Sequence, residues 1–229
     1  MTDRAPSGRD AVMSKIRSKL AGDAPAGQRA AVVAARLADQ PAHVLPQRVQ
    51  TDADGLEALF KAHLESQSAA IVDVHNDADI PAAIAGWLRG ANLPMRLRMG
   101  DDARLEALPW SSAPALTLEK GRAQPTDEVG LTHAVAAVAE TGTLVLTSGT
   151  DNPVTVNFLP ENHVVIVRAK DIVGPYETAF DRVRALYGKG VMPRTLNMIS
   201  GPSRTGDIGG RLVMGAHGPR RMCVIVVHD

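Results

Sequence analysis

The sequence predicts an α/β domain with a mostly parallel sheet covered by helices on both faces, preceded by an N-terminal helical arm. Short apolar segments rich in β-branched residues recur along the chain, as at 69–74 and 163–167. Amphipathic segments with helical periodicity alternate with them from residue 52 onward. The strand-like segments are mostly apolar rather than alternating with polar residues. Such runs are typical of parallel strands that are buried on both faces.

The composition fits an ordinary globular protein. The 229 residues are 45% hydrophobic and 22% charged, and only 3% are aromatic, so we expect a core built mainly from aliphatic side chains. Lys+Arg and Asp+Glu number 25 each. This balance argues against sequence-independent binding of nucleic acid through a strong positive charge.

Two further features of the sequence limit the cellular location and the redox chemistry that we expect. The chain start lacks the apolar core of a signal peptide, and no apolar run is long enough to span a bilayer, so we expect a cytoplasmic protein. Cys223 is the only cysteine, which excludes an internal disulfide and an iron–sulfur cluster held by this chain's cysteines alone. Its apolar context indicates a buried strand rather than a reactive thiol.

Residues 1–50 are predicted to form the arm, and residues 51–229 the α/β domain. Val12, Ile16 and Leu20 recur on one face of a first helix, and a second helix is expected over 28–38. A helix with a single apolar stripe cannot form a core alone. The arm therefore docks either on its own domain or on another subunit, which would make the protein a homo-oligomer.

The domain itself is expected to begin with a helix whose apolar face carries Leu56, Phe60 and Leu64. A buried strand follows at 69–74, and Asp79 and Pro81 open a helix that ends at Gly90. Further elements are predicted as a strand at 95–99, a short helix over 103–108 and a strand around 116–118. The segment 129–139 is compatible with either helix or strand.

The second half continues the alternation. Strands are predicted at 143–147 and 163–167, the latter containing the strongest β signal of the chain. A helix is expected from Pro175 to Gly188, followed by strands at 195–199 and 223–227.

Glu140 is the first candidate for chemistry, because it stands between an apolar run and a predicted strand. A carboxylate there is costly to bury unless a partner hydrogen-bonds or neutralises it. It could be a general base, a nucleophile or an anchor for a substrate hydroxyl. The structural alternative is a carboxylate that caps backbone N–H groups of the next turn. The adjoining Thr141, Gly142 and Thr143 are candidate substrate-binding residues.

The segment 200–207 follows a predicted strand, and ligands of open α/β sheets bind at the carboxyl ends of strands. Hydroxyl groups and the Arg204 guanidinium could hold a phosphate or a carboxylate. Asp207 could orient Arg204 or act on a substrate. The alternative is a helix start capped by Ser203. The candidate binding residues are Ser200, Gly201, Ser203, Arg204, Thr205 and Gly206.

His217, between Gly215 and Gly218, is the histidine expected to face a site. No spacing of His, Asp and Glu indicates a metal site, and no Gly-x-Ser-x-Gly motif indicates a hydrolase.

Four motifs in order resemble the lactate-utilization protein C family, the short form of the LUD domain. They are 139–146, Leu159-Pro160 with His163-Val164, 199–208 and 215–219. The resemblance implies a fold like that of ribose-phosphate isomerases, glucosamine-phosphate deaminases and CoA transferases. It also implies a role in bacterial oxidation of L-lactate to pyruvate, alongside partner proteins that carry iron–sulfur clusters, with no cofactor in this chain. Two departures stand out: position 206 is Gly where the family often has Ala, and 151–156 lacks an arginine often found in that loop.

Three functions remain open at this point. The first is a subunit or accessory protein that binds a small carboxylate or other anionic ligand through Glu140, Ser203, Arg204, Asp207 and His217. The second is a free-standing enzyme of the CoA-transferase or sugar-phosphate isomerase kind, with Glu140 or Asp207 as catalytic nucleophile or base. The third is an assembly factor with a vestigial pocket.

Overall fold

The computed structural model describes residues 7–21, 25–39, 44–207 and 209–228. The chain divides into two units, residues 1–44 and residues 45–229, and each is described by itself. The first unit contains helices α1 (Gly8–Ala21) and α2 (Ala26–Asp39). Both were predicted, with slightly different ends. Residues 45–50, assigned to the arm in the sequence analysis, belong to the second unit.

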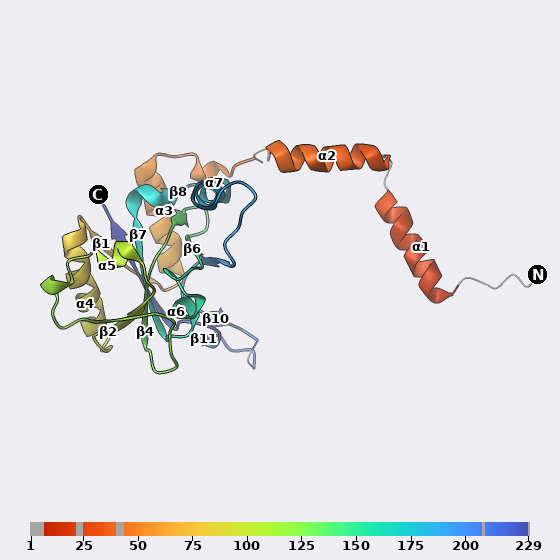
Figure 1. Ribbon diagram of the computed structural model, residues 1–229. Helices are drawn as coiled ribbons and strands as arrows, with labels where there is room; N and C mark the ends of the chain where they lie inside the picture. The colour runs from red at the N-terminus through yellow and green to blue at the C-terminus, as the bar shows by residue number, and fades with distance from the viewer. Residues whose placement is uncertain (1–6, 22–24, 40–43, 208, 229) are drawn as a thin grey trace, which may run out of the picture. The chain divides into compact units, whose positions relative to one another are not determined.

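The second unit is built on a six-stranded sheet in which every pairing is parallel (Figure 1). Its strand order is β1-β12-β7-β4-β2-β3. The strands are β1 (Ala70–Val74), β2 (Arg96–Met99), β3 (Thr117–Lys120), β4 (Val129–His133), β7 (Asn162–Arg168) and β12 (Arg221–Val227). The predicted α/β architecture with a mostly parallel sheet is confirmed.

A second sheet of four strands was not predicted. Its order is β8-β5-β6-β9, with strands β5 (Ala136–Val138), β6 (Thr143–Thr147), β8 (Ile172–Val173) and β9 (Leu196–Ile199). Strand β6 is antiparallel to both β5 and β9. The ambiguous segment 129–139 therefore forms two strands, β4 and β5, that belong to different sheets. A hairpin of β10 (Arg204–Thr205) and β11 (Val213–Met214) completes the strands.

The helices of this unit are α3 (Ala53–Ser66), α4 (Ile80–Gly90), α5 (Ala103–Glu106), α6 (Val154–Phe158) and α7 (Tyr176–Tyr187). Short 3₁₀ turns are η1 (Gln47–Val49), η2 (Asp77–Asp79), η3 (Trp110–Ser112) and η4 (Ala169–Asp171). Local signals explain the clearest ends. The Asp52 carboxylate accepts a hydrogen bond from the Gly55 N–H at 2.9 Å, and Gly188 ends α7 with a φ of +94°. None of the helices in these described ranges has the length and hydropathy needed to cross a membrane.

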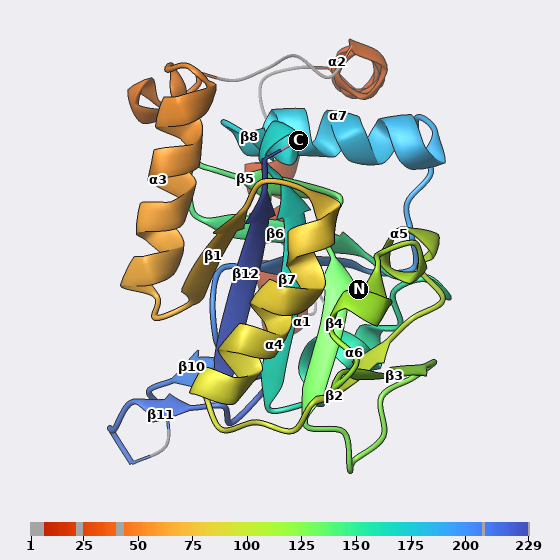
Figure 2. The same ribbon diagram turned by 90° about the vertical axis from the view of Figure 1, so that its left-hand side faces the viewer.

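Two apolar layers hold the central sheet, one on each face. Helix α4 covers one face, where Ile84 and Leu88 pack with Ile166 and Ile225 (Figure 2). On the other face, Phe60 and Leu64 of α3 pack with Val224 and with Leu144 of the second sheet. Helices therefore cover both faces, as predicted, but on the face with α3 the second sheet also packs against the central sheet. Alternate residues of β7 and β12 point into the two layers, which is why residues 164–167 and 222–227 are all apolar.

His163 lies inside this packing and has no exposed surface. Its Nε2 lies 2.8 Å from the Thr132 hydroxyl. Burial lowers the pKa of His163 to about 3, because the charged imidazolium would lose its hydration. The imidazole is therefore neutral in the folded protein at ordinary pH.

This histidine should make the protein acid-sensitive. Unfolded His163 binds a proton below pH ~6.5 while the folded form does not until about pH 3, so stability should fall as pH drops between these values. Well below pH 6.5 the slope from one such group is about 1.4 kcal/mol per pH unit. His163→Gln should flatten the dependence of unfolding free energy on pH by roughly that slope. Urea unfolding at pH 7, 5.5 and 4.5 measures it, with the exposed His217→Gln as control. Equal slopes in the wild type and His163→Gln would refute this account.

Candidate functional site

The motif 140–143 and the motif 200–207 meet through a cluster of hydroxyl groups. The Thr143 Oγ1 lies 2.6 Å from the Ser200 Oγ, 2.7 Å from the Thr141 Oγ1 and 2.9 Å from the Tyr176 hydroxyl. Thr141 also lies 2.7 Å from Tyr176. Because β6 and β9 pair antiparallel, the start of one lies beside the end of the other, which explains this meeting. Sequence reasoning missed Tyr176, which lies in the first turn of α7.

The glycines of these motifs allow close packing on helix α3. Gly142 has a φ of +65°, and a Cβ there would lie 2.6 Å from the Cβ of His63. Gly201 has a φ of +116°, and its Cβ would lie 2.7 Å from the Cβ of Gln67. Only glycine accepts both the backbone angle and the contact. These two positions therefore fix the loops against the end of α3.

Glu140 forms an ion pair with Arg48 of η1, with 3.2 Å between Oε1 and Nη2. The Glu140 side chain is 17% exposed and that of Arg48 is 54% exposed. Arg48 therefore neutralises the carboxylate, the requirement that the sequence analysis set for a buried Glu140. The partner could not be found from sequence because it lies in the segment assigned to the arm.

The motifs 200–207 and 215–219 are also joined to each other. The Ser203 N–H donates to the Pro219 carbonyl at 2.8 Å, and the Gly215 N–H donates to the Ser203 carbonyl at 2.9 Å. The His217 N–H donates to the Ser203 Oγ at 3.3 Å. No helix begins here: residues 204–205 form β10, so the capping alternative for Ser203 is wrong.

These motifs lie at the amino-terminal edge of the central sheet, not at its carboxyl edge. Pro219 comes just before β12, and Arg204 Nη2 donates to the Ser68 hydroxyl, just before β1, at 2.8 Å. Figure 2 shows the β10–β11 hairpin beside the starting ends of β7 and β12. The segment 200–207 does follow the carboxyl end of a strand, as expected, but that strand is β9. That strand belongs to the antiparallel sheet, so its end does not reach the ligand-binding edge of the parallel sheet.

Of the five residues proposed to bind an anion together, Ser203 and His217 contact each other, whereas Glu140, Arg204 and Asp207 have separate partners. Glu140 pairs with Arg48, Arg204 with Ser68, and Thr205 lies 3.4 Å from Asp207. Across the described part of the chain, no hydrogen bond or ion pair joins Glu140 to Arg204, Asp207 or His217. Gly206, Asp207 and His217 are exposed.

The carboxyl edge of the central sheet instead carries a cavity of about 540 Å³. Asp101 follows β2, and Gly121 and Arg122 follow β3, so the ends of two parallel strands form one wall. The loop after β6 and the residues before β9 form the rest. The lining residues are Asp101, Gly121, Arg122, Ser148, Gly149, Thr150, Pro153, Val154, Thr155, Arg194 and Thr195.

A second cavity, of about 430 Å³, adjoins the first at Asp101. Its walls include Asp102, Arg104 and Tyr187. The Asp102 carboxylate binds Arg104 in a two-point contact, with Oδ1–Nε at 2.8 Å and Oδ2–Nη2 at 2.6 Å. His133, at the end of β4, is buried and interacts electrostatically with Arg104. Burial and the positive charge of Arg104 lower the pKa of His133 to about 4.

Comparison with known proteins identifies the family. The profile of the LUD domain matches residues 57–227, most of the second unit. The chain belongs to the LUD domain family.

Two curated relatives of this LUD domain carry the description "Lactate utilization protein C". The chain is 38% identical over 102 residues to "Lactate utilization protein C" of Shouchella clausii, and the match covers 44% of each chain. It is 39% identical over 102 residues to the protein of that description from Bacillus subtilis, covering 44% of this chain and 42% of the relative. The chain therefore spans less than half the length of these relatives in the matched region.

A solved structure supports the fold. The crystal structure of a DUF162 family protein from Deinococcus radiodurans matches with a TM-score of 0.58 and 26% identity. The match covers 77% of this chain and 99% of the other.

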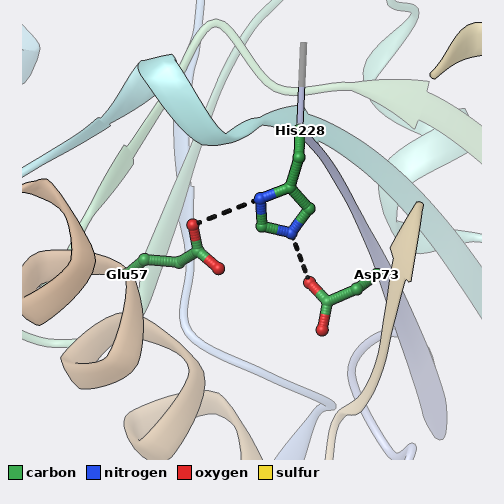
Figure 3. A group of neighbouring side chains, drawn as sticks. All are labelled: Glu57, Asp73 and His228. Carbon is green, nitrogen blue, oxygen red and sulfur yellow. Dashed lines mark hydrogen bonds and ion pairs between the residues drawn. The ribbon is translucent and has the colours of Figure 1, made fainter. Parts of the chain in front are cut away.

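One further group of ligand-type side chains lies in this LUD domain, formed by Glu57, Asp73 and His228 (Figure 3). The His228 Nε2 lies 2.9 Å from Asp73, and the Lys61 ammonium lies 2.5 Å from Glu57 and 2.6 Å from Asp73. Burial alone would raise the pKa of Asp73, but hydrogen bonds from Lys61 and His228 outweigh it and lower that pKa. Because Lys61 already supplies a positive charge to both carboxylates, the group is an ion-pair network that joins α3 to β1 and to the residue after β12.

Proposed function

We propose that this LUD domain acts in lactate utilization, in the oxidation of L-lactate to pyruvate, as a subunit or accessory protein that binds a small anionic ligand. The observation that carries the proposal is the shared description of its relatives, "Lactate utilization protein C", at 38–39% identity. Electrons from lactate would pass to iron–sulfur proteins that work with it.

The state of Cys223 supports a partner for the redox step. The thiol lies in β12 with no exposed surface, and burial raises its pKa to about 12. A neutral buried thiol is a poor nucleophile, metal ligand or electron carrier. This chain would therefore handle the ligand while other proteins carry the electrons.

The environment of Glu140 favours a subunit or accessory protein over a free-standing enzyme. A glutamate that acts as nucleophile or base needs a carboxylate facing its substrate. Here Arg48 holds the carboxylate, and Glu140 lines neither the carboxyl-edge cavity nor the cavity that adjoins it at Asp101.

The test is L-lactate-dependent dye reduction in host extracts that lack this chain. We expect the rate to fall at least tenfold, about 1.4 kcal/mol in apparent barrier, and to return when the wild-type protein is added. Full activity without the protein would overturn the proposal.

Adding Glu140→Gln to the same extracts separates the lactate role from the free-standing enzyme. The amide can still accept a hydrogen bond from Arg48, so we expect at least half of the wild-type rate. Loss of activity by a variant that melts like the wild type would favour the catalytic role of Glu140.

A further inference from the structure

The cavity at the carboxyl edge has walls that are fixed by hydrogen bonds between distant segments. The Asp101 N–H donates to the Thr150 carbonyl at 3.0 Å, which ties the end of β2 to the loop after β6. The Thr195 N–H donates to the Ser148 Oγ at 2.8 Å, and the Ala123 N–H donates to the Thr155 Oγ1 at 3.0 Å. These hydrogen bonds fix the walls of the cavity relative to one another.

Close backbone contact also holds this loop in place. A Cβ on Gly100 would lie 2.1 Å from the Asp151 carbonyl oxygen, so the loop can approach β2 only because residue 100 is glycine. Asn152, which is 4% exposed, donates from Nδ2 to the Thr147 carbonyl at 3.1 Å. A buried side chain therefore fixes the shape of the loop from within.

The charges that line the cavity favour an anion. Arg122 and Arg194 both line it, and within the described ranges neither guanidinium has a recorded hydrogen-bond or ion-pair partner. Asp101 is the only carboxylate among the described residues that line the cavity, so the positive charge of this lining is in excess. Arginine forks bind phosphate and carboxylate oxygens through paired hydrogen bonds.

The hydroxyl groups add donors of the same kind. The Ser148 and Thr155 oxygens accept backbone N–H groups, which leaves each O–H proton available to donate. Thr150 and Thr195 bring two further hydroxyl groups to the lining. Donors combined with two cations match an oxyanion and not a metal ion.

The size of the cavity separates two kinds of anion. At about 540 Å³ it falls within the range of roughly 300–1,000 Å³ that is typical for ligands of cofactor size. A three-carbon acid such as L-lactate would fill a small part of it and needs only one arginine. Two arginines suit a ligand with two negative charges.

We infer that this cavity binds a phosphate-bearing ligand larger than lactate, with Arg122 and Arg194 as its anchors. The inference deepens the proposed function by naming the ligand class and rests on it only for the biological role. The residues responsible differ from the glycine motifs that mark the family in the sequence.

Calorimetric titration of the full chain with inorganic pyrophosphate at fixed ionic strength tests the inference. We expect saturable binding, and at least tenfold weaker binding for Arg122→Met and for Arg194→Met. Arg89→Met, an exposed arginine on α4 that lines neither cavity, should bind within twofold of the wild type. Thermal melting of each variant confirms that it is folded.

Two results would overturn the inference. One is the absence of saturable pyrophosphate binding up to about 10 mM, or binding that both cavity variants leave unchanged. The other is tighter binding of L-lactate than of pyrophosphate, which would assign the cavity to the small carboxylate itself. If dye reduction still depends on the chain while pyrophosphate fails to bind, the proposed function stands and only the ligand class is wrong.

Discussion

Phe60→Ala should lower the free energy of unfolding by about 3–5 kcal/mol, the range for loss of a buried aromatic side chain. Phe60 has no exposed surface and packs from α3 into the layer between the central sheet and the second sheet. Removing the ring leaves a cavity that neighbouring strands, fixed by their hydrogen bonds, cannot fill. Urea unfolding followed by circular dichroism measures the change.

Phe158→Ala is the matched control, because Phe158 is 39% exposed at the end of α6. Its loss should cost about 1 kcal/mol or less, since little apolar surface is taken out of the core. Similar losses for the two variants would mean that α3 does not supply the main packing on its face of the sheet.

Gly142→Ala should destabilise the protein by about 3 kcal/mol, from two costs that act together. The backbone at φ +65° costs an L-residue roughly 1–2 kcal/mol. The added Cβ would also lie 2.6 Å from His63 and 3.1 Å from the Leu64 nitrogen, and overpacking of this kind costs roughly 1–3 kcal/mol. Thermal and urea unfolding measure the sum.

Gly190→Ala isolates the backbone cost. Gly190 has a φ of +81°, but a Cβ there would meet no atom within 4 Å. We expect a loss of about 1–2 kcal/mol at this position. If Gly142→Ala costs no more than Gly190→Ala, the motif 140–143 is not packed against α3 as described.

The parallel sheet could be predicted because its strands are buried on both faces. Residues 164–167 of β7 and 222–227 of β12 are all apolar, and helix α3 has a clear cap in Asp52. The second sheet could not be predicted in the same way. Strand β8 has two residues, and the alanines around β5 favour helix as an isolated segment. This segment forms strand β5 because it pairs with β6 and is buried against α7. These are contacts between distant parts of the chain, which a local sequence pattern does not show.

The candidate site was harder to predict, for a physical reason. Glycine motifs are conspicuous in a sequence, but glycine serves close packing as well as ligand binding. Gly142 and Gly201 serve packing here, on α3. Arg122 and Arg194 stand in no motif, and only the fold brings them to the same cavity. A signal existed for Arg122 alone, since it follows a predicted strand, where ligands of parallel sheets bind.

The most direct test of this account is whether the carboxyl-edge cavity is the working site of the LUD domain. L-lactate-dependent dye reduction would be measured in extracts that lack the chain, after adding the double variant Arg122→Met/Arg194→Met or the control Arg89→Met. We expect the double variant, although folded, to restore less than about a tenth of the wild-type rate, while the control restores all of it. Full restoration by the double variant would contradict the account and return attention to the glycine motifs at the opposite edge of the sheet.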